Sequence, residues 1–236
     1  MRPLLALDTS TPCARVAVLS AEGDGLAAAE KTAARHSSNL LRLCDEVLTL
    51  AGTSVSGLAA IACGAGPGSF TGLRVGLAVA KGLALADAVP LVLVSSLDAL
   101  AADLTTAGGT DLVLPCIDAG KGQVYGRLYR RVGQAAASTG DDDLALLPED
   151  LCRLVQTQAA GASLQAGGNG VDRYPEVFRA HLGVEAVRVA FAGPSALAVG
   201  RLALARLARG ERDDLETSVP RYGRPPDITK PKTGPL

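Results

Sequence analysis

The sequence is poor in aromatic residues and has no excess of either charge. Trp is absent and aromatic residues make up only 3% of the 236 residues, so a protein that reads single-stranded nucleic acid by base stacking is not expected. Lys plus Arg total 23 against 24 Asp plus Glu, which leaves no overall positive field to attract nucleic acid. Contact with RNA would therefore need a local patch or a partner.

Histidine is scarce and cysteine lacks any recognisable spacing. The two histidines, His36 and His181, form no His-x-x-x-His pair, and no G-x-S-x-G segment is present, so a zinc or iron enzyme and a serine hydrolase are not expected. The five cysteines are odd in number and include no C-x-x-C pair. They indicate buried thiols in a reducing cytosol and neither a disulfide framework nor a zinc knuckle.

Long uninterrupted hydrophobic runs are also missing. The most apolar zone, Val75 to Val94, is broken by Lys81, Asp87 and Pro90, which argues against a membrane span. The apolar run Leu4 to Leu7 is too short for a secretory signal. We expect a cytoplasmic protein with no membrane contact.

What is present is a globular composition, 48% hydrophobic and 20% charged, and a pattern that occurs twice. An aliphatic run, Leu4 to Leu7, ends at Asp8, and after a polar turn an alternating run returns through Val16. The same order recurs with Leu112 to Ile117, Asp118 and a returning strand through Val124 to Tyr129. The repetition indicates an internal duplication of a strand, an aspartate turn and a strand.

Hydrophobic spacing places the remaining elements between and after these units. It predicts strands at residues 26–31, 58–63, 91–94, 164–166 and 186–191, and helices at 40–50, 73–86, 96–104, 148–158, 175–182 and 194–209. Two such halves predict a two-lobed α/β protein of actin-like form, with duplicated mixed sheets flanked by helices. We expect an N-terminal lobe over 1–107, a C-terminal lobe over 108–210 and a Pro-rich tail over 211–236.

The two aspartate turns are the first candidates for chemistry. Asp8, Thr9 and Ser10 follow one strand, and Asp118 and Lys121 follow the other. Backbone N–H groups in such turns can bind a phosphate, with the aspartates facing each other across the cleft to hold a metal. Aspartate also favours turns because its carboxylate accepts a hydrogen bond from the chain two residues on. Both interpretations stay open from the sequence.

A glycine-rich loop between a strand and a helix is the second candidate. Residues 64–72, GAGPGSFTG, match neither G-x-G-x-x-G nor the P-loop pattern. The loop can still hold an anion at the helix N-terminus, or it can be a tight bend that lets the helix pack closely. Gly72, Gly76 and Ala80 then form a small-residue stripe, which usually meets the protein's own sheet and can also meet a second chain.

Five segments together resemble one family. They are LLALDTSTPCARVAVL at the start, RHSSNLL at 35–41, GPGSFTGLRVGLAVAKGLAL at 66–85, VSSLDALA at 94–101 and IDAGKGQVYGRLY at 117–129. The combination resembles the TsaB (YeaZ) family over about the first 130 residues. The GPGSFTGLR block is the most specific part.

The resemblance implies an actin-like, sugar-kinase-like (ASKHA) fold and a role in making N6-threonylcarbamoyladenosine at position 37 of tRNAs that read codons beginning with A. It implies a non-catalytic scaffold that pairs with a TsaD-type transferase, works with a TsaE-type ATPase, and meets tRNA only through that complex. No cofactor is required by the chain itself, and the resemblance allows contact with ATP or ADP in the complex. The absence of His-x-x-x-His separates this sequence from the transferase.

The resemblance also implies a partner surface formed by two helices. By position it contains the following residues: His36, Ser37, Ser38, Leu40, Leu41, Cys44, Ser69, Thr71, Arg74 and Leu77. The sequence departs from the family at the second turn, where Gly120 and Gln123 replace an arginine and an acid. The C-terminal P-x-Y-x-R pattern is kept at 220–224.

Two alternatives stay beside the scaffold hypothesis. The chain could be a self-sufficient ATPase or small-molecule kinase that uses Asp8 and Asp118 for metal and phosphate. It could also be a homodimer that pairs through the same helix faces, which we expect as a fallback when the partner is missing.

Overall fold

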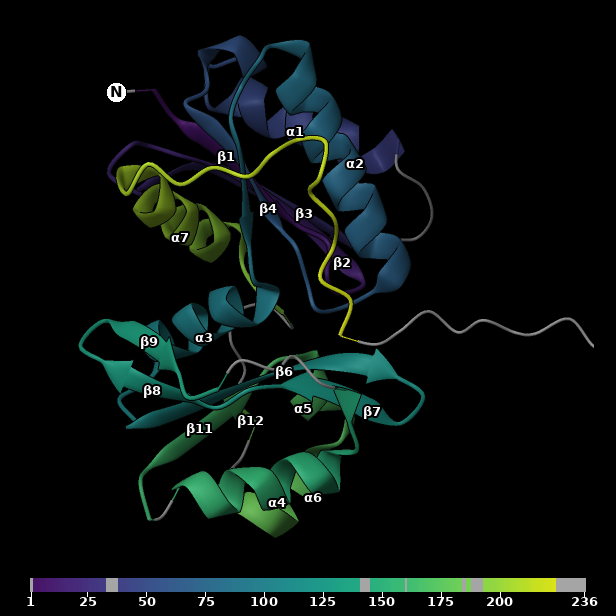
Figure 1. Cartoon of the computed structure of the whole chain (residues 1–236), viewed down its shortest axis with the longest axis vertical. Coiled ribbons are helices and arrows are strands. Elements are labelled where there is room, and N and C mark those ends of the chain that lie inside the picture. Colours follow the sequence, from purple (N-terminus) through teal and green to yellow (C-terminus); the bar gives the residue numbers. More distant parts are fainter. Residues whose placement is uncertain are drawn as a thin grey trace, which may run out of the picture.

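The computed structural model describes residues 2–32, 38–140, 145–159, 161–183, 186–187 and 193–223. Figure 1 shows two lobes stacked along the long axis, each built on one sheet. This arrangement confirms the two-lobed α/β fold expected from the sequence.

The first sheet has five strands in the order β3-β2-β1-β4-β5. Its strands are β1 (Leu4–Asp8), β2 (Cys13–Leu19), β3 (Gly25–Thr32), β4 (Ala60–Gly64) and β5 (Leu91–Val94). β1, β2 and β3 are antiparallel neighbours, whereas β4 and β5 run parallel to β1. Strands β1, β4 and β5 are buried along their whole length, which explains their unbroken apolar sequences.

The second sheet repeats this topology. Its main path is β10-β7-β6-β11-β12, formed by β6 (Leu112–Gly120), β7 (Gln123–Gly126), β10 (Ala145–Leu146), β11 (Leu164–Gly167) and β12 (Ala186–Val187). Strand directions also match, with β10, β7 and β6 antiparallel and β11 and β12 parallel to β6. The internal duplication is therefore confirmed. The residues 188–191 of the expected last strand lie outside the described residues.

The structure divides the returning strand expected in the second lobe into two separate strands. The returning strand stops at Gly126, and β8 (Tyr129–Val132) pairs farther back along β6 and forms a hairpin with β9 (Ala135–Ser138). At this break the backbone passes close to the Leu151 side chain. A Cβ at Gly126 would lie 2.5 Å from Leu151 Cδ2.

Helices cover both faces of each sheet. On the first sheet, α1 (Ser38–Leu50) and α2 (Phe70–Ala86) pack on one face, and α7 (Ala196–Ala208) packs on the other. A short 3-10 turn, η1 (Val55–Gly57), precedes β4. On the second sheet, α4 (Pro148–Ala159), α5 (Asn169–Arg173) and α6 (Pro175–Leu182) lie on one face, and α3 (Ser96–Ala107) lies on the other.

The two halves thus exchange their last helices (Figure 1). α3 follows the first sheet in sequence but buries Leu97, Leu100 and Leu104 against the second, whereas α7 follows the second sheet and buries Val199 and Ala203 against the first. Equivalent serines, Ser95 and Ser195, cap the two helices. The expected boundary at residue 210 therefore differs from the packing, since α7 belongs to the first lobe.

Residues 211–223, here called the C-terminal strap, also lie on the first lobe. Asp213 N donates to the Leu91 carbonyl over 2.9 Å, and Leu93 N donates to Asp213 Oδ2 over 2.7 Å. These bonds cover the edge of β5, which would otherwise offer open backbone groups. Residues 224–236 of the expected tail lie outside the described residues.

Among the described helices, none combines the length and hydropathy needed for a membrane span.

Candidate functional site

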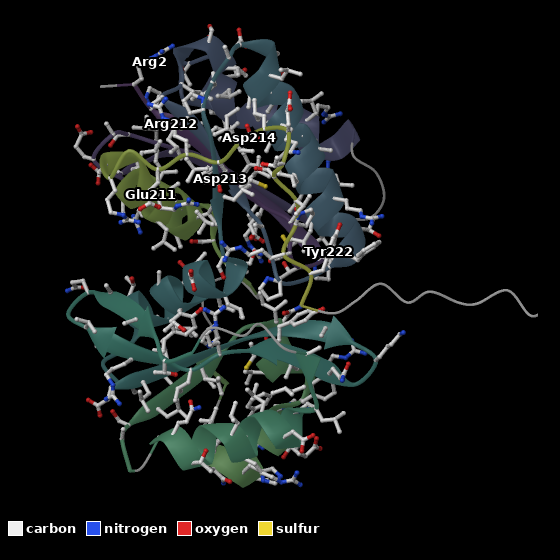
Figure 2. All side chains as sticks on the ribbon, viewed as in Figure 1. Arg2, Glu211, Arg212, Asp213, Asp214 and Tyr222 are labelled. Atoms are coloured by element: carbon white, nitrogen blue, oxygen red, sulfur yellow. The ribbon has the colours of Figure 1, made fainter. Side chains whose placement is uncertain are left out.

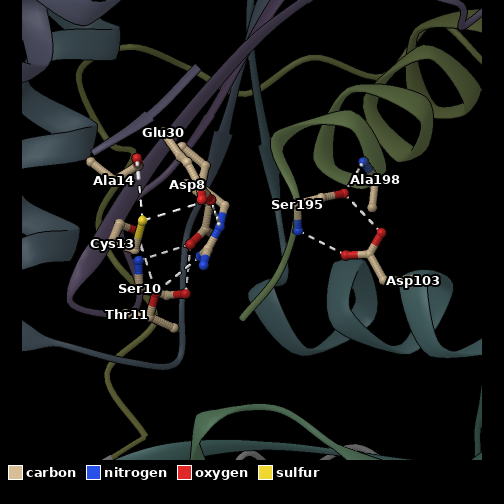
Figure 3. A network of polar contacts seen from close by, with 10 residues as sticks. Asp8, Ser10, Thr11, Cys13, Ala14, Glu30, Asp103, Ser195 and Ala198 are labelled. Atoms are coloured by element: carbon tan, nitrogen blue, oxygen red, sulfur yellow. Dashed lines mark hydrogen bonds and ion pairs between the residues drawn. The ribbon is translucent and has the colours of Figure 1, made fainter. Parts of the chain in front are cut away.

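The Asp8 side chain is hydrogen-bonded within its own turn (Figure 3). Asp8 is completely buried. Its Oδ1 accepts hydrogen bonds from Ser10 N at 2.9 Å and from Ser10 Oγ at 2.6 Å, and its Oδ2 accepts one from Ser96 Oγ at 2.7 Å. Burial raises the pKa of the Asp8 carboxyl above its usual value, and the hydrogen bonds from Ser10 and Ser96 act in the opposite direction. The carboxylate therefore binds β1, its own turn and the start of α3 together.

The glycine-rich loop and α2 fill the space beside this turn. Ser69 N donates to the Ser10 carbonyl over 2.7 Å, and Thr9 Oγ1 donates to the Gly72 carbonyl over 2.8 Å. A Cβ at Gly72 would lie 2.1 Å from the Thr9 carbonyl oxygen, and one at Gly76 would lie 2.1 Å from Thr9 Oγ1. The small-residue stripe therefore meets the protein's own first turn, as the close-packing interpretation predicts.

These contacts engage the polar side chains of the first turn within the protein. Asp8, Thr9 and Ser10 are all buried, and their side chains bond to one another, to Gly72 and to Ser96. Ser69, the loop serine expected near an anion, caps α2 by accepting a hydrogen bond from Gly72 N. An Asp8 carboxylate that holds a metal would first have to break three internal hydrogen bonds.

The second aspartate turn has the same local bond but an open setting. Gly120 N donates to Asp118 Oδ1 over 3.0 Å, which matches the Ser10 bond to Asp8. The Asp118 side chain keeps 20% exposure and pairs with Arg173 Nη1 at 3.4 Å. Lys121 is exposed, and its φ of 53° is positive like those of its neighbours Gly120 and Gly122, 68° and 79°. The second turn is thus more exposed than the first.

Across the described ranges, no group of three or more His, Cys, Asp or Glu residues is placed to hold a metal ion.

The expected partner surface divides into buried and exposed residues. Leu40, Cys44 and Leu77 are no more than 5% exposed and lie in the core between α1, α2 and the first sheet. Their side chains are therefore not on the outer face, a correction to the expected surface. Leu41 is 50% exposed, and Ser69, Thr71 and Arg74 are also exposed. His36 and Ser37 lie outside the described residues, as does the side chain of Ser38.

The outer face of α1 and α2 carries an apolar groove that sequence reasoning located only in part. The groove is lined by Leu41, Arg74, Val75, Ala78, Val79, Gly82 and Leu83. We call it the α1–α2 groove. Five of these residues, Val75, Ala78, Val79, Gly82 and Leu83, were not expected at the surface, and three of them also pack partly against the core. The glycine stripe gave no signal for them, because at about 3.6 residues per turn Leu83 falls on the same side of α2 as Gly72 and Gly76.

An exposed aromatic and arginine cluster borders this groove. Arg74 Cζ lies 3.8 Å from the centre of the Phe70 ring, and Arg74 Nε donates to Tyr222 Oη over 2.9 Å. The rings of Phe70 and Tyr222 are 5.0 Å apart, centre to centre. The P-x-Y-x-R pattern at 220–224 marked Tyr222 in the sequence, but nothing in the sequence placed it on α2.

Comparisons with known proteins agree with this geometry. A TsaB protein of Escherichia coli, described as a tRNA threonylcarbamoyladenosine biosynthesis protein, is 33% identical over 174 residues, which cover 74% of each chain. This chain belongs to the TsaB family. A second TsaB relative, from Haemophilus influenzae, is 38% identical over 52% of this chain and 51% of its own length.

Other matches extend the same assignment. The family model for TsaD, tRNA N6-adenosine threonylcarbamoyltransferase, matches residues 23–194. A crystal structure of a Pseudomonas aeruginosa protein described as similar to YEAZ has a TM-score of 0.80 at 33% identity, covering 95% of this chain and all of that one. A ROK hexokinase from Thermus thermophilus has a TM-score of 0.51 at 14% identity over 88% of this chain and all of its own. At that identity the hexokinase shows the fold alone, which is the sugar-kinase-like fold expected for the TsaB family.

Proposed function

We propose that this chain is a non-catalytic scaffold subunit in the synthesis of threonylcarbamoyladenosine on tRNA. In this proposal it pairs with a TsaD-type transferase through the α1–α2 groove and works with a TsaE-type ATPase. Transfer RNA meets the complex and not the isolated chain, and no cofactor is required by the chain itself. The TsaB relatives support the pathway, and the groove is the observation that supports the pairing.

The surface of the groove is suited to a protein partner. Leu41 exposes half of its side chain, and Val75, Ala78 and Val79 add apolar area on the neighbouring helix. Contiguous exposed apolar surface beside an arginine and two aromatic rings is typical of protein interfaces. A transferase of the same fold would cover this surface with its own helices.

The state of the first turn supports a non-catalytic role. Asp8 would be one of two carboxylates in a self-sufficient ATPase or kinase, yet it is buried and bound by Ser10 and Ser96. In the complex, a nucleotide would contact the second turn, where Asp118 is partly exposed and Lys121 is exposed.

The pairing is tested by titrating the full chain with the cognate TsaD-type protein in a calorimeter. Leu41→Glu should weaken binding at least about thirtyfold, since it places a charge in an apolar interface. Leu154→Glu is the matched control, because Leu154 is 49% exposed on α4 of the other lobe and should bind as the wild type does. Absence of binding by the wild type with ATP, ADP or no nucleotide would contradict the proposal.

The non-catalytic role is tested by activity of the purified chain alone. We expect no adenosine modification in a tRNA transcript and no ATP turnover above that of Asp118→Asn. Turnover that Asp118→Asn removes would instead establish the ATPase alternative. Light scattering over a concentration series separates a homodimer from a monomer and shows whether the transferase displaces a second copy.

A further inference from the structure

The exposed cluster of Phe70, Arg74 and Tyr222 holds an arginine in a fixed position at the border of the α1–α2 groove. Arg74 lies one turn after Phe70 on α2, and its guanidinium stacks on the Phe70 ring at 3.8 Å. Tyr222 Oη accepts the Nε hydrogen over 2.9 Å. Two independent contacts thus restrict a side chain that is usually mobile on a protein surface.

The strap fixes Tyr222 from a distant part of the sequence. Figure 2 shows Tyr222 beside α2, and Asp213 and Glu211 farther back along the strap near α7. Arg221 N donates to the Ala65 carbonyl over 2.7 Å. A Cβ at Gly66 would lie 2.7 Å from the Arg221 carbonyl oxygen, so the strap lies directly on the glycine-rich loop. The end of the strap and the glycine-rich loop that leads into α2 are therefore held together by backbone contacts.

The held guanidinium keeps its outer edge available. Within the described part of the chain, Arg74 forms no ion pair, and its Nε is the atom used by Tyr222. The two Nη groups remain for an external acceptor. A guanidinium presents such a pair of donors in the geometry that a carboxylate binds with both oxygens. Because the side chain is already fixed, little further conformational entropy is lost on binding.

We propose that Arg74, positioned by Phe70 and Tyr222, binds an Asp or Glu carboxylate of the protein partner that docks on the α1–α2 groove. This inference rests on the proposed pairing with a transferase and adds the chemistry of the contact. The partner segment is an apolar helix with an acidic side chain level with Arg74. Tyr222 is a positioning residue, since it acts through Arg74 and carries no charge to the partner.

The test measures the dissociation constant of the full chain and the cognate transferase at low and high salt. Arg74→Gln should weaken binding about tenfold or more at low salt, and the salt dependence of the dissociation constant should become flatter, since one charge pair is lost. Arg42→Gln on α1 is the matched control. Arg42 is 71% exposed and pairs with Glu46 of its own helix, so its removal should leave the dissociation constant within about twofold.

The role of Tyr222 is tested by a double-mutant cycle. Tyr222→Phe keeps the ring and removes the acceptor of the Arg74 bond, and it should weaken binding about threefold. The double variant Arg74→Gln, Tyr222→Phe should bind as Arg74→Gln alone does, because the tyrosine has no effect without the arginine. Additive losses would show that Tyr222 acts by another route and would overturn its positioning role.

The outcomes separate this inference from the proposed function. If Leu41→Glu abolishes binding and Arg74→Gln leaves it unchanged, the pairing stands and the carboxylate contact is overturned. If Arg74→Gln leaves the protein pair unchanged and lowers tRNA binding by the complex, Arg74 binds phosphate and the inference is again overturned. If the wild-type chain binds no transferase, the proposed function itself fails.

Discussion

The first and second turns hold their aspartates by the same backbone bond and differ in what surrounds them. Ser10 N reaches Asp8 over 2.9 Å, and Gly120 N reaches Asp118 over 3.0 Å. Asp8 is then buried against Gly64 and Ser96, whereas Asp118 remains partly exposed beside Arg173. The local sequence thus determines the bond, and the packing of distant elements determines whether the carboxylate is accessible.

The largest expected difference comes from adding one methyl group to a glycine packed against the first turn and to a glycine within the second. Gly72→Ala places a Cβ 2.1 Å from the Thr9 carbonyl, a backbone atom with no room to move, and should lower the free energy of unfolding by about 3 kcal/mol or more. Gly122→Ala meets no atom within 4 Å and costs only the left-handed φ of 79°, about 1 kcal/mol. Urea unfolding of both variants measures the difference. Equal losses would show that α2 does not close the first turn.

An intermediate difference is expected when each carboxylate is changed to an amide. Asp8→Asn leaves a buried NH2 group facing the donors of Ser10 or Ser96, which should cost about 2 kcal/mol of unfolding free energy. Asp118→Asn weakens a partly exposed ion pair and should cost less than about 1 kcal/mol. Thermal unfolding of the two variants against the wild type ranks them. A larger loss from Asp118→Asn would reverse the assignment of the structural and the open turn.

The smallest effect is the pH dependence that Asp8 adds to stability. Burial raises the pKa of folded Asp8 above 3.8, so the folded state retains this proton to higher pH than the unfolded state does. Stability from this group is therefore highest at low pH and falls as the pH rises from 3.8 through the folded pKa. The difference in unfolding free energy between wild type and Asp8→Asn should decrease over that window. A difference that increases with pH would mean that hydrogen bonds outweigh burial.

Much of the fold follows from the sequence because its strands and helices carry clear local patterns. The buried strands β1, β4 and β5 are continuous apolar runs, and the spacing of α1 predicts one inner face. The exchange of α3 and α7 does not follow, because both helices are apolar enough to pack on either sheet. The strap is also not predictable, since its contact with β5 consists of one backbone and one side-chain hydrogen bond of Asp213, which no local sequence pattern marks.

Only part of the candidate partner surface could be predicted, because local patterns do not fix which side of α2 faces outward. α2 has apolar residues around most of its circumference, so hydrophobic spacing alone does not decide which of Leu77 and Val79 faces outward. The stripe of Gly72 and Gly76 does not decide it either, because at about 3.6 residues per turn Val79 lies nearer to Gly72 in angle than Leu77 lies to Gly76. The structure buries Leu77 in the core and leaves Val79 partly buried. Arg74 was expected on the partner surface, but its contact with Tyr222 joins residues 148 positions apart.

The exchanged helices also set an order for synthesis. A nascent chain that has left the ribosome as far as α6 contains all five strands of the first sheet. At that stage one face of the sheet is not yet covered by α7, and the edge of β5 is not yet bonded to the strap. The earliest lobe to be translated is therefore the last to be finished, and it exposes apolar β-structure until translation is nearly complete. Separate expression of residues 1–107 should yield an aggregating fragment rather than a domain.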